Sequence, residues 1–131
     1  MSPRAAPPKW EKPDAALTAI FDASLAGLPD VERRKMFGQP CAFVHEHMFA
    51  GLFGQRMMIR LGEAERKRFL AEEPGSSIFS INPGMEMHEY LDVPEHVWSD
   101  PQKLHSWIER AYQYAVSLPP KVKKGKKGKK K

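Results

Sequence analysis

The segment between residues 32 and 61 constrains the fold most, because it holds four short strand-like runs with no room for a helix between them. The runs cover residues 32–37, 41–45, 48–53 and 56–61. Turn-forming residues separate them, and Gly54-Gln55 places glycine at the first central position that a type II′ hairpin requires. Strands joined by such tight turns pair antiparallel. The segment therefore predicts an antiparallel sheet, with a further turn at Glu46-His47.

Helical periodicity on either side of this segment predicts what covers the sheet. A first helix begins near Pro13 and ends at Gly27 and Pro29, and a long helix begins after the cap Asp100 and ends at residues 119–120. Each carries an apolar stripe at helical spacing. The stripes are Leu17, Ile20, Phe21, Leu25 and Leu28 in the first helix, and Leu104, Trp107, Ile108, Ala111, Ala115 and Leu118 in the last.

Residues 63–73 form a third predicted helix, with the paired acids Glu72-Glu73 at its end, and residues 86–93 a fifth strand after a loop at 74–85. Two amphipathic helices must bury their stripes, and one face of the sheet is the natural partner. We therefore expect an α+β fold, a two-layer sandwich in which helices pack on one face of an antiparallel sheet of about five strands.

Proline content and charge divide the chain into three parts. Residues 1–12 are rich in proline and predict a flexible N-terminal arm, residues 13–120 predict one domain, and residues 121–131 predict a disordered tail. The tail holds eight lysines and no acid, so of the net charge of +5, removing these eight leaves −3 for residues 1–120. The high isoelectric point therefore belongs to the tail and not to the folded body.

The tail predicts non-specific binding of nucleic acid, DNA or RNA, through its phosphates. Clustered lysines release counterions from a phosphate backbone but read no bases, and no aromatic residue interleaves them for stacking. An anionic protein or membrane surface, or a purely solubilising tail, are the alternatives. The candidate phosphate contacts are Lys121, Lys123, Lys124, Lys126, Lys127, Lys129, Lys130 and Lys131.

Arg33, Arg34 and Arg60 are weaker candidates for nucleic-acid contact. Arg56 and Arg60 lie four residues apart on one predicted strand, an even spacing that puts them on the same face and would suit an anion-binding surface. The alternative is an ordinary solvated strand face whose cations are balanced by acids such as Glu32.

Strand 48–53 is apolar on both faces, which predicts an additional contact. Helices on one side of the sheet would leave a second apolar face, which we assign to Met48, Leu52 and Met58. A protein partner or a second copy in a homodimer would cover it. The N-terminal arm or the loop 74–85 would be the intrachain alternative.

Neither a metal site nor a catalytic centre is expected. His45 and His47, with Glu46 or His88, are the only metal candidates, and they match no metal-ligand spacing. A pocket near Cys41 and His45, with Glu89, is the enzymatic or ligand-binding alternative. No cofactor motif is present. The single cysteine and the lack of an apolar run predict a cytoplasmic protein without membrane insertion.

Four motifs resemble the N-terminal domain of the TfoX/Sxy family, small bacterial proteins named for a regulator of natural competence. They are RKMFG at 34–38, MFAGLFG at 48–54, IRL at 59–61 and WIERAYQYAVSLPPK at 107–121. The resemblance implies a helix, an antiparallel sheet of about five strands, further helices on one side, and a regulatory or interaction role without an established catalytic centre. The family's competence regulators carry a second, helical C-terminal domain where this chain has its lysine tail, so a competence role does not carry over.

These observations favour a non-enzymatic regulatory or adaptor domain that binds a protein partner and carries a tail with phosphate affinity. The alternatives are a small-ligand-binding protein or enzyme, and a plain oligomeric structural protein.

Overall fold

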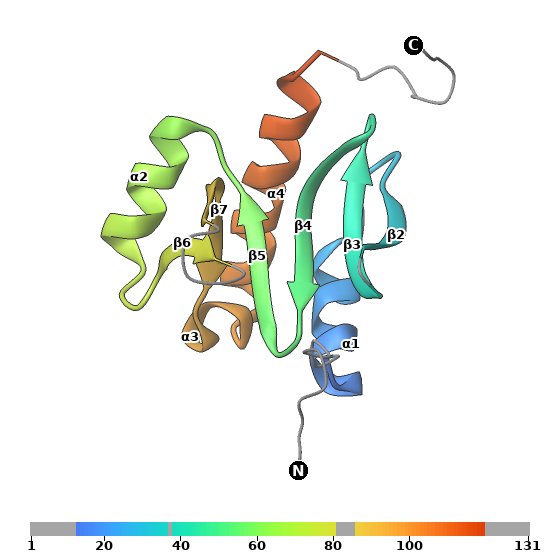
Figure 1. Cartoon of the computed structure of the whole chain (residues 1–131), viewed down its shortest axis with the longest axis horizontal. Helices are drawn as coiled ribbons and strands as arrows, with labels where there is room; N and C mark the ends of the chain where they lie inside the picture. The colour runs from blue at the N-terminus through green and yellow to red at the C-terminus, as the bar shows by residue number, and fades with distance from the viewer. Residues whose placement is uncertain (1–12, 37, 81–85, 120–131) are drawn as a thin grey trace.

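The computed structural model describes residues 13–36, 38–80 and 86–119, and these residues form a helix-covered sheet (Figure 1). The helices are α1 (Ala15–Ser24), α2 (Glu63–Glu72), α3 (Glu95–Trp98) and α4 (Pro101–Ser117). The strands are β2 (Glu32–Met36), β3 (Gln39–Val44), β4 (His47–Phe53), β5 (Arg56–Arg60), β6 (Ser77–Ser80) and β7 (Glu86–Val93).

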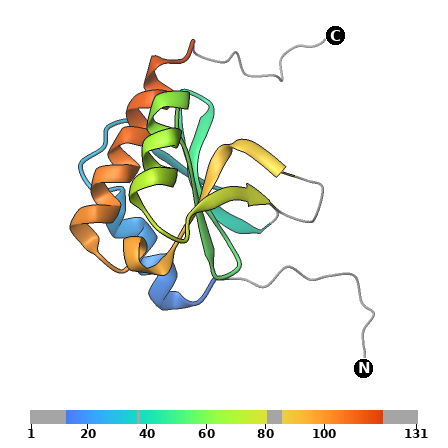
Figure 2. The same ribbon diagram turned by 90° about the vertical axis from the view of Figure 1, so that its left-hand side faces the viewer.

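The sheet has six strands in the order β2-β3-β4-β5-β7-β6, and every neighbouring pair is antiparallel. The helices lie on one side of it (Figure 2). The α+β sandwich expected from the sequence is therefore confirmed. β6 lies inside the segment predicted as a loop, so that part of the prediction is wrong. Four residues give too little alternation to indicate a strand, and pairing with β7 is what defines it.

Capping residues set where the two long amphipathic helices begin. The Asp14 carboxylate accepts a hydrogen bond from the Leu17 amide at 2.8 Å, so α1 begins at Ala15 and not at Pro13. Asp100 accepts from the amides of Gln102 and Lys103, each at 3.2 Å, as expected for a cap. The two helices therefore start where their first amides find an acceptor.

The main core lies between the helices and the facing side of the sheet. Most of the expected stripe residues are buried, although Ile20 in α1, and Leu28 and Leu118 just beyond the ends of α1 and α4, are only partly so. Its largest fully buried side chains are Phe21, Phe49, Phe69, Leu52, Met57, Ile59, Leu61, Leu91, Leu104 and Ile108. Within this core, α1, α2 and α3 all contact α4.

A β-bulge in β4 changes which side chains share a face. Phe43 pairs with Met48 and Ala42 with Ala50, so Phe49 is an extra residue in the strand. Beyond the bulge, the alternation of side chains between the two faces of the sheet is shifted by one residue. Leu52 therefore points to the helix side and is fully buried in the main core. The expectation that Leu52 shares a face with Met48 and Met58 is therefore wrong.

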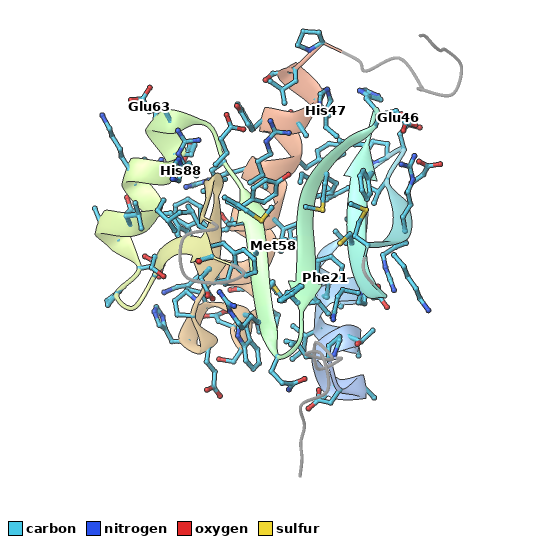
Figure 3. All side chains as sticks on the ribbon, viewed as in Figure 1. Phe21, Glu46, His47, Met58, Glu63 and His88 are labelled. Atoms are coloured by element: carbon cyan, nitrogen blue, oxygen red, sulfur yellow. The ribbon has the colours of Figure 1, made fainter. Side chains whose placement is uncertain are left out.

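The second face of the sheet carries a smaller core of its own. Phe53 and Met58 are 8 % and 6 % exposed, Phe79 of β6 is fully buried beside them, and the partly buried Met48 packs against this cluster. Met58 is labelled in Figure 3. The Phe53 and Phe79 rings meet edge to face with centroids 6.1 Å apart. Residues from the segment 74–85 thus cover part of this face, as in the intrachain alternative, while self-association through Met48 and Met58 stays a prediction.

Gly51 has no room for a side chain where β3, β4 and β5 meet on this second face. A Cβ there would lie 2.9 Å from Cys41 Sγ and 3.2 Å from Met58 Cε. We expect Gly51→Ala to lower the free energy of unfolding by about 1–3 kcal/mol, the usual cost of overpacking. Urea denaturation measures this cost. Adding Cys41→Ala removes the closest atom and should recover part of it; no recovery would contradict the packing explanation.

Candidate functional site

The three candidate arginines all contact carboxylates in the described structure. The pairs are Arg33 with Asp22 (2.7 Å), Arg34 with Glu46 (2.9 Å) and with Glu32, and Arg60 with Glu89 (2.7 Å). Hydrogen bonds from Glu46 and Glu32 raise the pKa of Arg34 above its ordinary value. Each positive charge is thus already balanced within the folded body.

These arginines also lie on different surfaces. The Arg33 guanidinium lies 5.9 Å from the Phe21 ring on the helix side, whereas Arg34 lies 4.6 Å from the Phe43 ring. Arg60 belongs to β5, and two strands separate it from β2. The three do not form one basic patch, and phosphate contact through them stays a prediction.

The tail lysines lie outside the described residues, but the structure shows where the tail begins. His47, the first residue of β4, is 7 % exposed, and its Nε2 lies 2.7 Å from the Pro119 carbonyl oxygen just after α4. Because that oxygen can only accept, Nε2 carries the proton. Pro119, the last described residue before the tail, is therefore hydrogen-bonded to the start of β4 beside the β3–β4 turn. His47 and Glu46 mark this turn in Figure 3.

The histidine candidates are not brought together as ligands. His45 and Glu46 form the turn, with φ angles of 52° and 69°, so the turn lies one residue earlier than expected. His45 and His88 are exposed, while His47 is buried with Nδ1 lacking a hydrogen-bond partner among the described residues. Within ranges 13–36, 38–80 and 86–119, no three His, Cys, Asp or Glu side chains gather to hold a metal.

The groups of the enzymatic alternative occupy different environments. Cys41 is 1 % exposed in the middle of β3, and burial raises the pKa of its thiol to about 11. His45 is exposed at the turn, and Glu89 is ion-paired with Arg60. A protonated, buried thiol is a poor nucleophile.

Cys41 is expected to resist alkylation in the native protein. At about pH 8 a thiol with this pKa is almost entirely protonated, and iodoacetamide should label it roughly a hundredfold more slowly than in the urea-unfolded chain. Mass spectrometry of quenched samples follows the reaction. Equal labelling rates in the native and unfolded chains would contradict the burial of the thiol.

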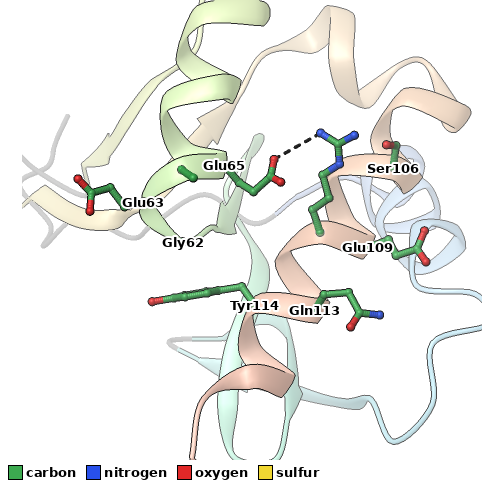
Figure 4. A pocket seen from close by; sticks show the side chains of 9 residues that line it. Gly62, Glu63, Glu65, Ser106, Glu109, Gln113 and Tyr114 are labelled. Atoms are coloured by element: carbon green, nitrogen blue, oxygen red, sulfur yellow. Dashed lines mark hydrogen bonds and ion pairs between the residues drawn. The ribbon is translucent and has the colours of Figure 1, made fainter.

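A hollow on the helix side lies between the start of α2 and the middle of α4 (Figure 4). Its volume is about 630 Å³. Its lining residues are Gly62, Glu63, Ala64, Glu65, Ser106, Glu109, Arg110, Gln113 and Tyr114. A second cleft of about 370 Å³ shares Ser106 and Arg110 with it and extends toward Asp100. No sequence pattern predicted this groove, because its only local signals are acids in the first turn of α2 and polar residues off the apolar stripe of α4.

A smaller, more apolar hollow of about 220 Å³ lies between α1 and the α3–α4 junction. Ile20, Trp98 and Leu104 contribute its apolar lining, and His105 Nδ1 lies 3.0 Å from the Ser24 carbonyl oxygen at its edge.

A family model described as the TfoX N-terminal domain matches residues 23–115. The chain belongs to the TfoX N-terminal domain family. The match runs from within α1 into α4 and covers the whole sheet. No curated protein matches the chain significantly.

The TfoX N-terminal domain membership confirms the resemblance carried by the four sequence motifs, and it supports a regulatory or adaptor domain in general. None of the helices in the described part of this TfoX domain is both long and apolar enough to cross a bilayer.

Proposed function

We propose that this TfoX N-terminal domain is a non-enzymatic regulatory or adaptor domain whose lysine tail gives it non-specific affinity for nucleic-acid phosphates. One observation carries the proposal: positive charge is segregated. The body's candidate arginines are paired with carboxylates, whereas the tail's eight lysines are accompanied by no acid within residues 121–131. A phosphate that engages Arg33, Arg34 or Arg60 must therefore displace a carboxylate first, whereas residues 121–131 contain no acid that would compete for their lysines.

The chemistry of the body supports a binding role over a catalytic one. The Cys41 thiol is buried and its pKa is raised. Of the two groups proposed to act with it, Glu89 is ion-paired with Arg60 and His45 is exposed at a turn. A free, reduced cysteine also suits the cytoplasm, where we place the protein.

The tail hypothesis is tested by replacing all eight lysines with glutamine in the full chain. Fluorescence anisotropy with short double-stranded DNA and single-stranded RNA should show loss of binding to both, because each neutralised phosphate contact contributes counterion release. Lys35→Gln with Lys67→Gln is a control that removes two lysine charges from the body, where Lys67 is well exposed, and it should leave binding nearly unchanged. Equal affinity of the intact and tail-substituted chains would refute the proposal.

Contact with a protein partner or a second copy is proposed at the edge of the second sheet face. Met48 and Met87 are only partly buried there, beside the well-covered Met58. Sedimentation at several concentrations should reveal a dimer that Met48→Lys disrupts. If the protein is a monomer at all concentrations, self-association through this face is refuted, and only contact with a different protein is left.

A further inference from the structure

Strand β2 lies at one border of the sheet, and no described strand pairs with its outer side (Figure 1). On its inner side Arg34 lies opposite Cys41 of β3, and Lys35 lies opposite Pro40. Proline has no amide N–H, so Lys35 and Pro40 form a pair without mutual hydrogen bonds. Because hydrogen-bonded and non-hydrogen-bonded pairs alternate along an antiparallel ladder, the backbone groups of Arg33 and Lys35 point away from β3.

These outward groups leave β2 open to a further strand. Arg33 and Lys35 each present one N–H and one C=O, and none of the described residues hydrogen-bonds to these four groups. The opposite border, β6, has only four residues, and its Ser80 carbonyl oxygen already accepts a hydrogen bond from Arg56 at 2.8 Å. An extended peptide that adds to a sheet gains main-chain hydrogen bonds of the kind that β2 offers.

The charge of β2 indicates which kind of strand fits there. Arg33 and Arg34 are ion-paired, but at partly exposed sites where such pairs contribute little and exchange readily. Lys35 is exposed and forms no ion pair with any described residue. Arg33 and Lys35 lie two residues apart and share a face of the sheet. An added strand with acidic residues at alternate positions therefore places a carboxylate opposite each of these two cations.

The same charges disfavour β2 of a second copy as the added strand. A two-fold antiparallel pairing centred on Arg34 places Arg33 of one copy opposite Lys35 of the other. Pairings centred on Arg33 or on Lys35 place that cation opposite itself. Like charges directly opposite each other destabilise a strand pair. At the end of the strand, Met36 is 40 % exposed and adds apolar surface that a different extended segment would cover.

We propose that β2 binds an extended, acidic segment of a partner protein by strand addition, with acidic side chains at alternate positions opposite Arg33 and Lys35. The outward backbone groups supply the hydrogen bonds, and the cations select an acidic segment over a neutral or basic one. This proposal gives a chemistry to the protein partner of the adaptor role and rests on that role. The pairing itself does not depend on the lysine tail.

The probe is a short synthetic peptide that alternates glutamate and valine, with a lysine–valine peptide as its control. The protein is the full chain with all eight tail lysines replaced by glutamine, because the tail itself would attract an acidic peptide. In ¹H–¹⁵N spectra, the acidic peptide should shift the Arg33 and Lys35 amide protons downfield and slow their exchange with solvent, since both gain a hydrogen bond. The Arg34 amide faces β3 and should change much less. Equal changes at all three amides, or equal binding of the lysine peptide, would overturn the proposal.

Two substitutions of Lys35 separate the backbone contact from the charge. Lys35→Pro removes the outward N–H at an edge position that tolerates proline, and it should weaken peptide binding roughly tenfold or more. Lys35→Gln keeps the N–H and should weaken binding about two- to fivefold at low salt, as expected for one exposed ion pair. Lys67→Gln is the matched control on α2 and should leave binding unchanged. Unaltered affinity of a folded Lys35→Pro variant would overturn strand addition; should that variant not fold, the amide pattern of the unsubstituted edge decides.

The outcomes also separate this proposal from the proposed function of the tail. If the intact chain binds the acidic peptide and the tail-substituted chain does not, the tail holds the peptide and the role of β2 is overturned. If the tail-substituted chain binds it with the expected amide pattern, strand addition is supported whether or not the intact chain binds nucleic acid. If neither chain binds it, the cations of β2 only guard the sheet border against aggregation, and the proposal is refuted.

Discussion

Phe69→Ala is expected to lower the free energy of unfolding by about 3–5 kcal/mol, the cost of deleting a fully buried aromatic side chain. Phe69 is the one buried residue of α2, and its ring meets the Trp107 ring edge to face with centroids 4.8 Å apart. The substitution therefore leaves a cavity under α2 and removes the contact that holds this helix on α4. Urea or guanidinium denaturation measures the loss.

Leu70→Ala is the matched control, because Leu70 follows Phe69 in the same helix but is 40 % exposed. It should cost less than about 1 kcal/mol, as surface substitutions usually do. Similar losses for both variants would show that α2 does not dock through Phe69.

Trp107→Phe is expected to cost about 1–3 kcal/mol although the aromatic ring is retained. The Trp107 indole N–H donates a hydrogen bond to Glu73 at 2.9 Å, and the Glu73 side chain is only 6 % exposed. Lys103, at 3.4 Å, would remain as the nearest cation to a carboxylate that had lost its buried donor. Trp98→Phe makes the same chemical change at a half-buried site and should cost less, again by denaturation.

Replacing both Trp107 and Glu73 by apolar residues tests whether the buried carboxylate without its hydrogen-bond donor causes that loss. Replacing both members of a buried polar pair by apolar groups is much less costly than removing one. The double variant Trp107→Phe with Glu73→Leu should therefore be more stable than Trp107→Phe alone. A double variant that is less stable than the single one would place the cost in ring packing.

The sequence was informative about the fold wherever the signal was local. Alternating residues and turn glycines predicted β5 and the hairpin before it, and Gly54 has the expected positive φ of 62°. Residues 86–93 coincide with β7, and Asp100 caps α4 as expected. Each of these features depends on a few neighbouring residues.

Features that depend on distant partners were not predictable. β6 is defined by its pairing with β7, and the bulge at Phe49 is visible only from the register with β3. Glu73 was interpreted as part of a helix end, which is correct locally, since it follows the last residue of α2. Its burial depends on Trp107, 34 residues away. The groove was missed for the same reason, because it exists only once α2 lies beside α4.

The salt dependence of nucleic-acid binding is the most direct test of the claim that the tail carries the functional charge. For the intact chain, a plot of log affinity against log salt between about 50 and 200 mM should have a slope of several units, up to about −7 if most of the eight lysines engage. The lysine-to-glutamine tail variant should show a slope near zero at the limit of detectable binding. An unchanged slope in that variant would contradict the account, because phosphates would then be neutralised by the folded body.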